Sequence, residues 1–185
     1  MGVDKVMRRA VFLDRDGVLN RVIVREGKPY PPLGVSQLEI LPGVPEALAG
    51  LRDAGFLLIV VTNQPDVARG VLQKEDVESI NAALRRKLPL DDVRVCYHDD
   101  QDACNCRKPL PGLLLDAARD WRIDLKMSFM VGDRWRDIEA GHRAGCKTIL
   151  IDRVHHERLK SVPDYRAESL TQAAAQILSR RDSVT

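Results

Sequence analysis

Short apolar runs alternate along the chain with segments whose apolar residues recur at helical spacing. The runs have the length of β-strands and cover residues 10–13, 56–61, 93–96, 128–131 and 148–151. Between and after them, the spacing predicts helices over residues 44–54, 74–88, 111–121, 137–144 and 169–179. Strands that are apolar on both faces and separated by helices are typical of a parallel sheet with helices on each side. We therefore expect a doubly wound α/β fold.

The least regular stretch follows the first predicted strand. Residues 27–32 contain Pro29, Pro31 and Pro32, which break regular elements, so we expect a loop or flap there. No other stretch is long enough to build a second domain. We expect residues 1–185 to form one domain without a cap domain, which leaves an open cleft.

The balance of charge excludes a general binder of polyanions. The chain has 29 Lys and Arg against 27 Asp and Glu, a net charge of +2, and 44% of its residues are hydrophobic. This composition is typical of a globular protein. The basic runs stop at Arg85-Arg86-Lys87 and Arg180-Arg181, which we interpret as solvated helix faces. We therefore expect no nucleic-acid partner.

Neither a membrane segment nor a leader is apparent in the pattern. The longest apolar run, residues 56–61, is far shorter than the roughly 20 residues of a spanning helix. The first residues, 1–5, contain no apolar signal region. We expect a cytoplasmic protein without a membrane partner, whose four cysteines are reduced.

Polar residues follow four of the five predicted strands. In chain order they are Asp14-Arg15-Asp16-Gly17, Thr62-Asn63-Gln64, Cys96-Tyr97-His98 and Gly132-Asp133. In open α/β sheets, ligands bind outside the carboxyl ends of the strands. The sequence therefore predicts a polar site at one edge of the sheet.

Three acids at that edge favour a divalent cation. Asp14, Asp16 and Asp133 would bring like charges within a few ångströms, which disfavours ionising all of them. Mg²⁺ resolves the conflict, because it binds one or two carboxylates and completes its shell with water and phosphate oxygens. The alternative is that Asp-x-Asp-Gly is only a surface turn. The buried strand that leads into it favours the metal site.

Such a site suits phosphoryl transfer. Asp14 could act as a carboxylate nucleophile that forms an aspartyl-phosphate. Asp16 could protonate the leaving oxygen and later accept a proton from water. Thr62 and Asn63 could hold phosphate oxygens, although a helix cap is the alternative for this pair.

Basic residues complete the predicted site. Lys108 and Arg107 lie between a candidate metal loop and a helix led by Pro111. We expect Lys108 to contact the transferring phosphoryl group and Arg107 to recognise the substrate. Asp137 could orient Lys108 or a metal-bound water, or could simply lie in the first turn of a helix.

A second metal site is predicted by the cysteines. Cys96-x-His98 is followed, after five residues, by Cys104-x-Cys106. Three thiolates and one imidazole match a closed, tetrahedral, structural Zn²⁺ site. The alternative is three unrelated thiols and a surface histidine.

The motifs together resemble a known family. Asp14-Arg15-Asp16-Gly17-Val18-Leu19-Asn20, Val61-Thr62-Asn63-Gln64, Cys106-Arg107-Lys108-Pro109 and Gly132-Asp133 are similar to the four motifs of the haloacid dehalogenase (HAD) superfamily of phosphatases. With the zinc ligands, the chain resembles the branch that contains heptose bisphosphate phosphatases and histidinol-phosphate phosphatases. The resemblance runs from about residue 9 to residue 151.

The resemblance implies a HAD-like fold, an aspartyl-phosphate intermediate and bound Mg²⁺ and Zn²⁺. It implies Asp14 as nucleophile, Asp16 as acid and base, and Mg²⁺ on Asp14, the Asp16 carbonyl and Asp133. Substrate contacts are expected from residues at the matching motif positions and around them, namely Asn20, Asn63, Gln64 and Arg107, with Arg134 and Asp137 in support.

The branch implies a small phosphorylated sugar as substrate, first a heptose bisphosphate. We expect a monomeric enzyme. Histidinol phosphate is the alternative, followed by a nucleic-acid 3′-phosphate and by a binding module without activity. Tyr97, Pro65-Asp66 and Arg134 depart from the family's usual residues beside the substrate. These departures affect the identity of the sugar or its anomer and leave the catalytic set intact.

Overall fold

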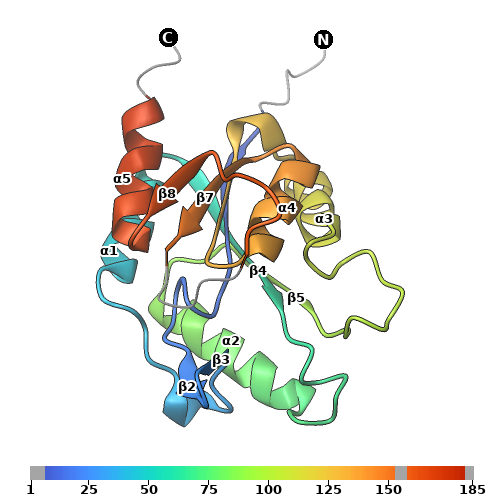
Figure 1. Cartoon of the computed structure of the whole chain (residues 1–185). Helices are drawn as coiled ribbons and strands as arrows, with labels where there is room; N and C mark the ends of the chain where they lie inside the picture. The colour runs from blue at the N-terminus through green and yellow to red at the C-terminus, as the bar shows by residue number, and fades with distance from the viewer. Residues whose placement is uncertain (1–6, 153–157, 182–185) are drawn as a thin grey trace.

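A six-stranded, entirely parallel sheet forms the centre of the computed structural model, which describes residues 7–152 and 158–181 (Figure 1). The strand order is β5-β4-β1-β6-β7-β8. The bounds of these strands are β1 (Arg9–Leu13), β4 (Phe56–Asn63), β5 (Asp92–Cys96), β6 (Phe129–Gly132), β7 (Lys147–Ile151) and β8 (Tyr165–Ala167). The five predicted strands are therefore confirmed.

Helices cover both faces of the sheet (Figure 1). One apolar layer joins the sheet to α1 (Val44–Asp53), α2 (Lys74–Lys87) and α5 (Leu170–Arg181). The other joins it to α3 (Gly112–Trp121) and α4 (Trp135–Ala144). Two short 3₁₀ turns, η1 (Val35–Gln37) and η2 (Leu125–Met127), complete the elements. This arrangement confirms the doubly wound α/β prediction.

The central strands show why the sequence folds this way. In β4 the residues from Phe56 to Thr62 are all buried, and only Asn63 at its carboxyl end is half-exposed. A strand buried on both faces gains from an uninterrupted apolar run, which is what residues 56–61 supply. Polar residues can begin only where the strand leaves the core. The apolar pattern thus fixes the edge at which the site forms.

Two features differ from the sequence prediction. β2 (Ile23–Arg25) and β3 (Lys28–Tyr30) form a two-stranded antiparallel ribbon, so the loop expected over residues 27–32 is wrong for Lys28–Tyr30. Pro29 is tolerated there, because an isolated ribbon has free edges where a missing N–H loses no ladder bond. The short edge strand β8 was also missed, since three residues carry too little pattern.

No helix among the described residues is long and apolar enough to cross a membrane.

Candidate active site

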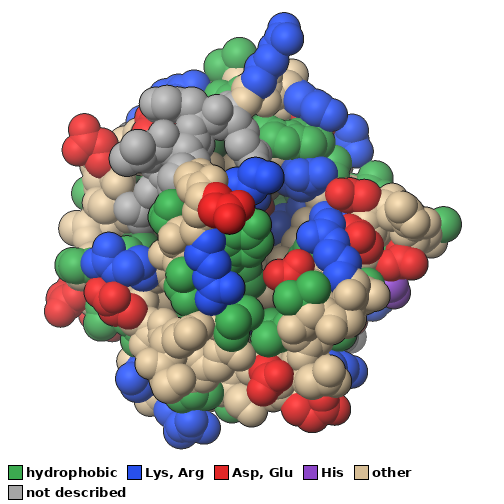
Figure 2. All heavy atoms as spheres, turned by 60° about the horizontal axis from the view of Figure 1, so that its bottom comes forward, with side chains coloured by type: hydrophobic (Ala, Val, Ile, Leu, Met, Phe, Trp, Pro, Cys, Tyr) green, Lys and Arg blue, Asp and Glu red, His purple; other side chains and the backbone are tan. Residues whose placement is uncertain are grey.

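Polar residues at the ends of β1 and β4 meet at the carboxyl edge of the sheet, around a cavity of about 190 Å³. Asp14, Thr62 and Lys108 line it, together with Pro29 and Tyr30 of the ribbon. The space-filling view shows a hollow on this side of the molecule, with basic side chains in and around it and acidic ones nearby (Figure 2). The edge predicted from the sequence is therefore a single concave site.

A buried lysine between two carboxylates lies at the centre of this site. Lys108 Nζ is 2.7 Å from Asp14 Oδ1 and 2.6 Å from Asp137 Oδ1, and it donates to the Val61 carbonyl at 2.8 Å. The lysine, Asp14 and Asp137 are all buried. A buried cation needs such partners, because it has lost its hydration. The ammonium group is thereby fixed beside the Asp14 carboxylate.

Asp137 contacts Lys108 and also lies in the first turn of α4, two of the arrangements that the sequence suggested for it. Its Oδ1 pairs with Lys108, and its Oδ2 accepts a hydrogen bond from the Arg134 N–H at 3.0 Å, where α4 begins. Gly132 makes room for this carboxylate, because a Cβ at Gly132 would lie 2.3 Å from Asp137 Cγ. The helix start and the lysine contact therefore depend on the same side chain.

The electrostatics of the acids favour a cation. Burial, against the opposing charge of Lys108, raises the pKa of Asp14 to about 6, and Asp137 and Asp16 add to the rise. Burial also raises the pKa of Asp133 well above its ordinary value, and Asp14 and Asp137 contribute to that shift. A carboxyl group whose ionisation is disfavoured by burial and by like charges becomes a good ligand once a divalent cation compensates its charge.

The donor set fits such an ion. Carboxylate oxygens of Asp14, Asp133 and Asp137 lie within 4.8 Å of one another. Asp133 Oδ1 is buried, and no described residue makes a hydrogen bond to it. Gly17, at φ +88°, permits this approach, since a Cβ there would lie 2.1 Å from Asp133 Oδ2. These oxygens match the ligands that Mg²⁺ prefers.

The carboxylate of Asp16 turns away from these oxygens. Its Oδ1 accepts from Asn20 Nδ2 at 2.9 Å, and its Oδ2 accepts from Gln64 Nε2 at 2.8 Å. Arg15 Nε and Nη2 lie 3.1 and 3.0 Å from the same Oδ2. Asn20 is fully buried, so in this structure its amide contacts Asp16 and the Arg21 carbonyl. The side chain of Asp16 is thus held by three residues, two from its own loop and one that directly follows β4.

The other residues predicted after β4 support the centre. Asn63 Nδ2 donates to the Lys108 carbonyl at 2.9 Å, and its Oδ1 accepts from the Lys108 N–H at 3.0 Å. Thr62 is buried, and its Oγ1 accepts from Gln64 Nε2 at 2.9 Å. Asn63 therefore fixes the backbone of the lysine, while Thr62 and Gln64 still line the cavity.

Arginines from three parts of the chain line the same cavity. Arg107 Nε donates to Asp100 Oδ1 at 2.9 Å, and Arg136 Nη2 lies 3.5 Å from that oxygen. Arg69 pairs with Asp99 at 2.6 Å. Sequence reasoning found Arg107 and Arg134, which also lines the cavity, but missed Arg69 and Arg136. An arginine outside a motif gives no signal until the fold brings it to the cavity.

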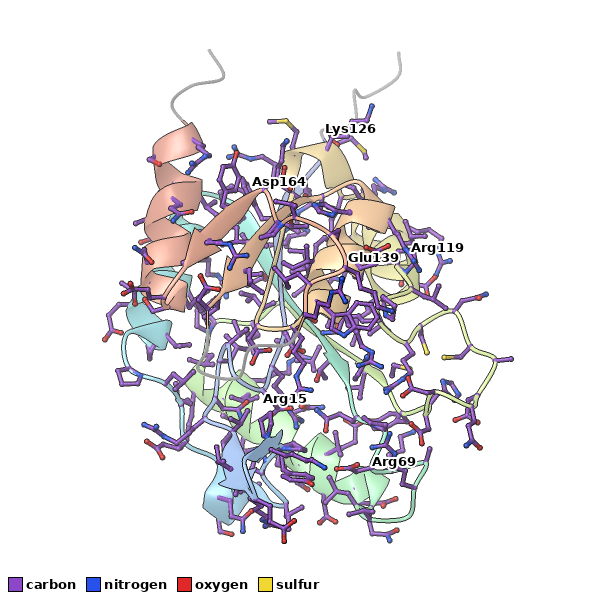
Figure 3. The ribbon with its side chains drawn as sticks, viewed as in Figure 1. Arg15, Arg69, Arg119, Lys126, Glu139 and Asp164 are labelled. Atoms are coloured by element: carbon purple, nitrogen blue, oxygen red, sulfur yellow. The ribbon has the colours of Figure 1, made fainter. Side chains whose placement is uncertain are left out.

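Arg15 is the other residue that sequence reasoning missed. It is the largest fully buried side chain in the described structure, and it lies where the sheet edge meets α2 (Figure 3). Its Nη1 donates to Asn81 Oδ1 of α2 at 2.9 Å. Its place inside the Asp14-Arg15-Asp16-Gly17 motif was the signal that could have found it, although arginines are rarely buried completely.

The four predicted zinc ligands come together after β5. Ligand atoms of Cys96, His98, Cys104 and Cys106 lie within 4.8 Å of one another, and the cysteines form no disulfide. The Cys96 and Cys104 sulfurs are 3.9 Å apart, and those of Cys96 and Cys106 are 2.9 Å apart. Zn–S bonds of about 2.3 Å at tetrahedral angles separate two sulfurs by about 3.8 Å, so the first pair already has this spacing and the second pair would have to widen. The cluster offers the ligand types of a Zn²⁺ site, and the loop after it carries Arg107 and Lys108.

The fold and the site define a hydrolase of the HAD class. A family model described as HAD-hydrolase-like matches residues 105–173. A heptose bisphosphate phosphatase from B. bronchiseptica, crystallised with magnesium and phosphate, has a TM-score of 0.78 at 30% identity. The match covers 93% of this chain and 99% of that one.

Curated relatives define the family. D-glycero-beta-D-manno-heptose-1,7-bisphosphate 7-phosphatase of Rhodopseudomonas palustris is 37% identical over 75% of this chain and 80% of its own length. D-glycero-D-manno-heptose-1,7-bisphosphate 7-phosphatase of Chlorobaculum tepidum is 35% identical over 89% and 92%. The chain belongs to this family of phosphatases. The predicted family and enzyme class are thereby confirmed.

Proposed function

We propose that this phosphatase hydrolyses the 7-phosphate of D-glycero-D-manno-heptose 1,7-bisphosphate. The observation that carries the proposal is the single cavity in which the Asp14–Lys108 pair and Arg69, Arg107 and Arg136 are gathered. One phosphate at the catalytic pair and a second at the arginines account for both halves of that cavity. The names of the relatives from R. palustris and C. tepidum support the same substrate.

In the proposed reaction Asp14 is the nucleophile. Its carboxylate attacks phosphorus, the bond to the sugar oxygen breaks, and Asp16 gives that oxygen its proton. Water then attacks the aspartyl-phosphate and returns a proton to Asp16, which releases inorganic phosphate and restores Asp14. Lys108 lies 2.7 Å from Asp14 Oδ1, where it can neutralise charge on the transferring group. Thr62 and the backbone that follows it contact the phosphate oxygens.

The remaining predicted residues hold this arrangement in the proposal. Asn63 positions Lys108, and Asn20 and Gln64 position Asp16, through the hydrogen bonds described above. Arg134 lines the cavity and can contact the substrate from the start of α4.

Two metal ions belong to the proposal. Asp14, Asp133 and the Asp16 carbonyl would hold Mg²⁺, with Asp137 beside them, and the ion would supply charge neutralisation for the phosphoryl group. Cys96, His98, Cys104 and Cys106 would hold a structural Zn²⁺.

The setting of the enzyme is also proposed. Thiolate ligands stay reduced in the cytoplasm, where we place the protein. We further propose that residues 1–185 act as a single domain and as a monomer, without a nucleic-acid partner.

The substrate is tested by steady-state kinetics on both anomers of heptose 1,7-bisphosphate and on histidinol phosphate, each with Mg²⁺. We expect the better anomer to exceed histidinol phosphate in kcat/KM by about 10-fold or more, because the second phosphate gains charge-assisted hydrogen bonds. A preference for histidinol phosphate would overturn the substrate. Undiminished turnover by Asp14→Asn would overturn the mechanism instead.

A further inference from the structure

We propose that Arg15 is a positioning residue for the proton-transfer step, acting through Asp16. This inference rests on the acid and base role proposed for Asp16. Arg15 is absent from the residues that line the cavity, and its side chain contacts Asp16 and Asn81 instead. Its function is to fix the plane in which the Asp16 carboxyl meets the leaving oxygen.

The contacts of Arg15 define that plane. Nε and Nη2 both approach Asp16 Oδ2, at 3.1 and 3.0 Å, while Nη1 donates to Asn81 Oδ1 at 2.9 Å. The guanidinium is planar and rigid, so its hydrogen bonds from Nε to Asp16 and from Nη1 to Asn81 determine its orientation and, through it, that of the carboxyl group. Asn20 holds the other oxygen of Asp16 from the opposite side.

Burial makes this arrangement specific. Arg15 is completely buried, and Asn81 is 3% exposed. A buried guanidinium remains charged and has no water to replace a lost partner, so the pair cannot swing as a surface pair does. An exposed pair such as Arg119 with Asp116 constrains little, because both side chains reach solvent. Asn81 of α2 thus anchors the guanidinium of Arg15, and the guanidinium fixes the direction of the Asp16 carboxyl group.

The direction of the Asp16 carboxyl group matters for proton transfer to the leaving oxygen. As the phosphorus–oxygen bond breaks, the proton on Asp16 must pass to the leaving oxygen of a sugar, which is a poor leaving group as an alkoxide. A small displacement of the acid therefore slows cleavage of an alkyl phosphate. p-Nitrophenolate leaves without a proton, so hydrolysis of p-nitrophenyl phosphate needs the acid much less.

The experiment compares these two leaving groups in Arg15→Lys, which keeps the charge but removes the fork. A positioned general acid contributes about 10²- to 10⁴-fold, so we expect kcat on an alkyl phosphate to fall about 10- to 100-fold. On p-nitrophenyl phosphate we expect a loss of less than about threefold. The alkyl phosphate is the one that the wild type hydrolyses fastest, so the inference is tested whichever sugar that proves to be.

Three further variants make the result decisive. Asp16→Asn should show the largest difference between the losses of kcat on the two substrates. Adding Arg15→Lys to Asp16→Asn should change these losses little. Asn81→Ala removes the partner of Arg15 Nη1 and should cause a smaller loss of kcat, again mainly on the alkyl phosphate. This variant tests the inference if Arg15→Lys does not fold. Arg94→Lys is the matched control, because Arg94 is a partly buried fork between Asp92 and Asp120.

Equal losses on both substrates in Arg15→Lys or Asn81→Ala, while Asp16→Asn distinguishes them, would overturn the inference and leave Arg15 as a tether for α2. If Asp16→Asn itself does not distinguish the substrates, the proposed role of Asp16 fails, and the inference fails with it. A loss confined to heptose bisphosphate among alkyl phosphates would also contradict it, because positioning of the acid affects every poor leaving group.

Discussion

Replacing Asp137 by Asn tests whether the buried lysine centre holds the site together. The carboxylate accepts from two donors at once, Lys108 Nζ at 2.6 Å through Oδ1 and the Arg134 N–H at 3.0 Å through Oδ2. Asn has nearly the same shape but a single oxygen. Its NH₂ group must therefore face either the ammonium or the backbone N–H, both of which are donors.

The magnitude follows from the partners that remain. Burial alone lowers the pKa of Lys108, yet Asp137 and Asp14 outweigh it and raise that pKa. Losing one buried partner costs about 3–5 kcal/mol when the charge is left uncompensated. Here Asp14 and the Val61 carbonyl remain, and repulsion between Asp137 and Asp14 is relieved. We therefore expect the free energy of unfolding to fall by about 2 kcal/mol.

The assay is urea unfolding and thermal unfolding without added metal. A loss of about 2 kcal/mol corresponds to about 4–8 °C in Tm for a chain of this length. Asp116→Asn is the control, since it removes an exposed carboxylate paired with Arg119 at 3.0 Å and should change stability by less than about 1 kcal/mol. An Asp137→Asn protein as stable as the wild type would refute the reasoning, because repulsion among the acids would then outweigh the lysine contact.

Three further predictions concern the metals and the second phosphate. Burial raises the pKa of Asp14 to about 6, so its carboxyl group is protonated below that pH and ionised above it. Mg²⁺ should therefore raise Tm more at about pH 7.5 than at about pH 5. Equal shifts of Tm at the two pH values, measured by calorimetry, would contradict this. Cys106→Ser should reduce bound zinc, measured by metal analysis, from about one ion per chain and lower Tm. Arg107→Ala should raise KM for the bisphosphate about 10-fold or more but leave KM for the 7-monophosphate nearly unchanged in initial-rate assays.

The apolar pattern was sufficient to predict the sheet because its strands are buried on both faces. Residues 56–61 have no polar position, and the structure buries all of them within β4. Short elements with mixed exposure gave no such signal. β3 contains Pro29, and β8 contains three residues at the edge of the sheet, so neither carries an apolar pattern long enough to predict a strand.

The motifs predicted which residues meet, but not how each side chain is used. Asn63 ends β4 and Gln64 follows it, yet their amides hold Lys108 and Asp16. Spacing along the chain cannot show this, because each partner comes from a different loop. The same holds for Arg69 and Arg136, which reach the cavity from the loop after β4 and from α4.

By itself, the sequence determined the parallel sheet, the edge that carries the candidate site, and the acids, the lysine and the four candidate zinc ligands that the structure brings together. These features follow from the local pattern and from the spacing within motifs, neither of which depends on contacts between residues distant in the chain. Only the tertiary structure decided that Lys108 bridges Asp14 and Asp137, and that Arg15 is buried against Asp16. The physical reason is desolvation. Whether a charged side chain is solvated or is buried beside a fixed partner depends on the residues that pack over it, and those residues are distant in the sequence.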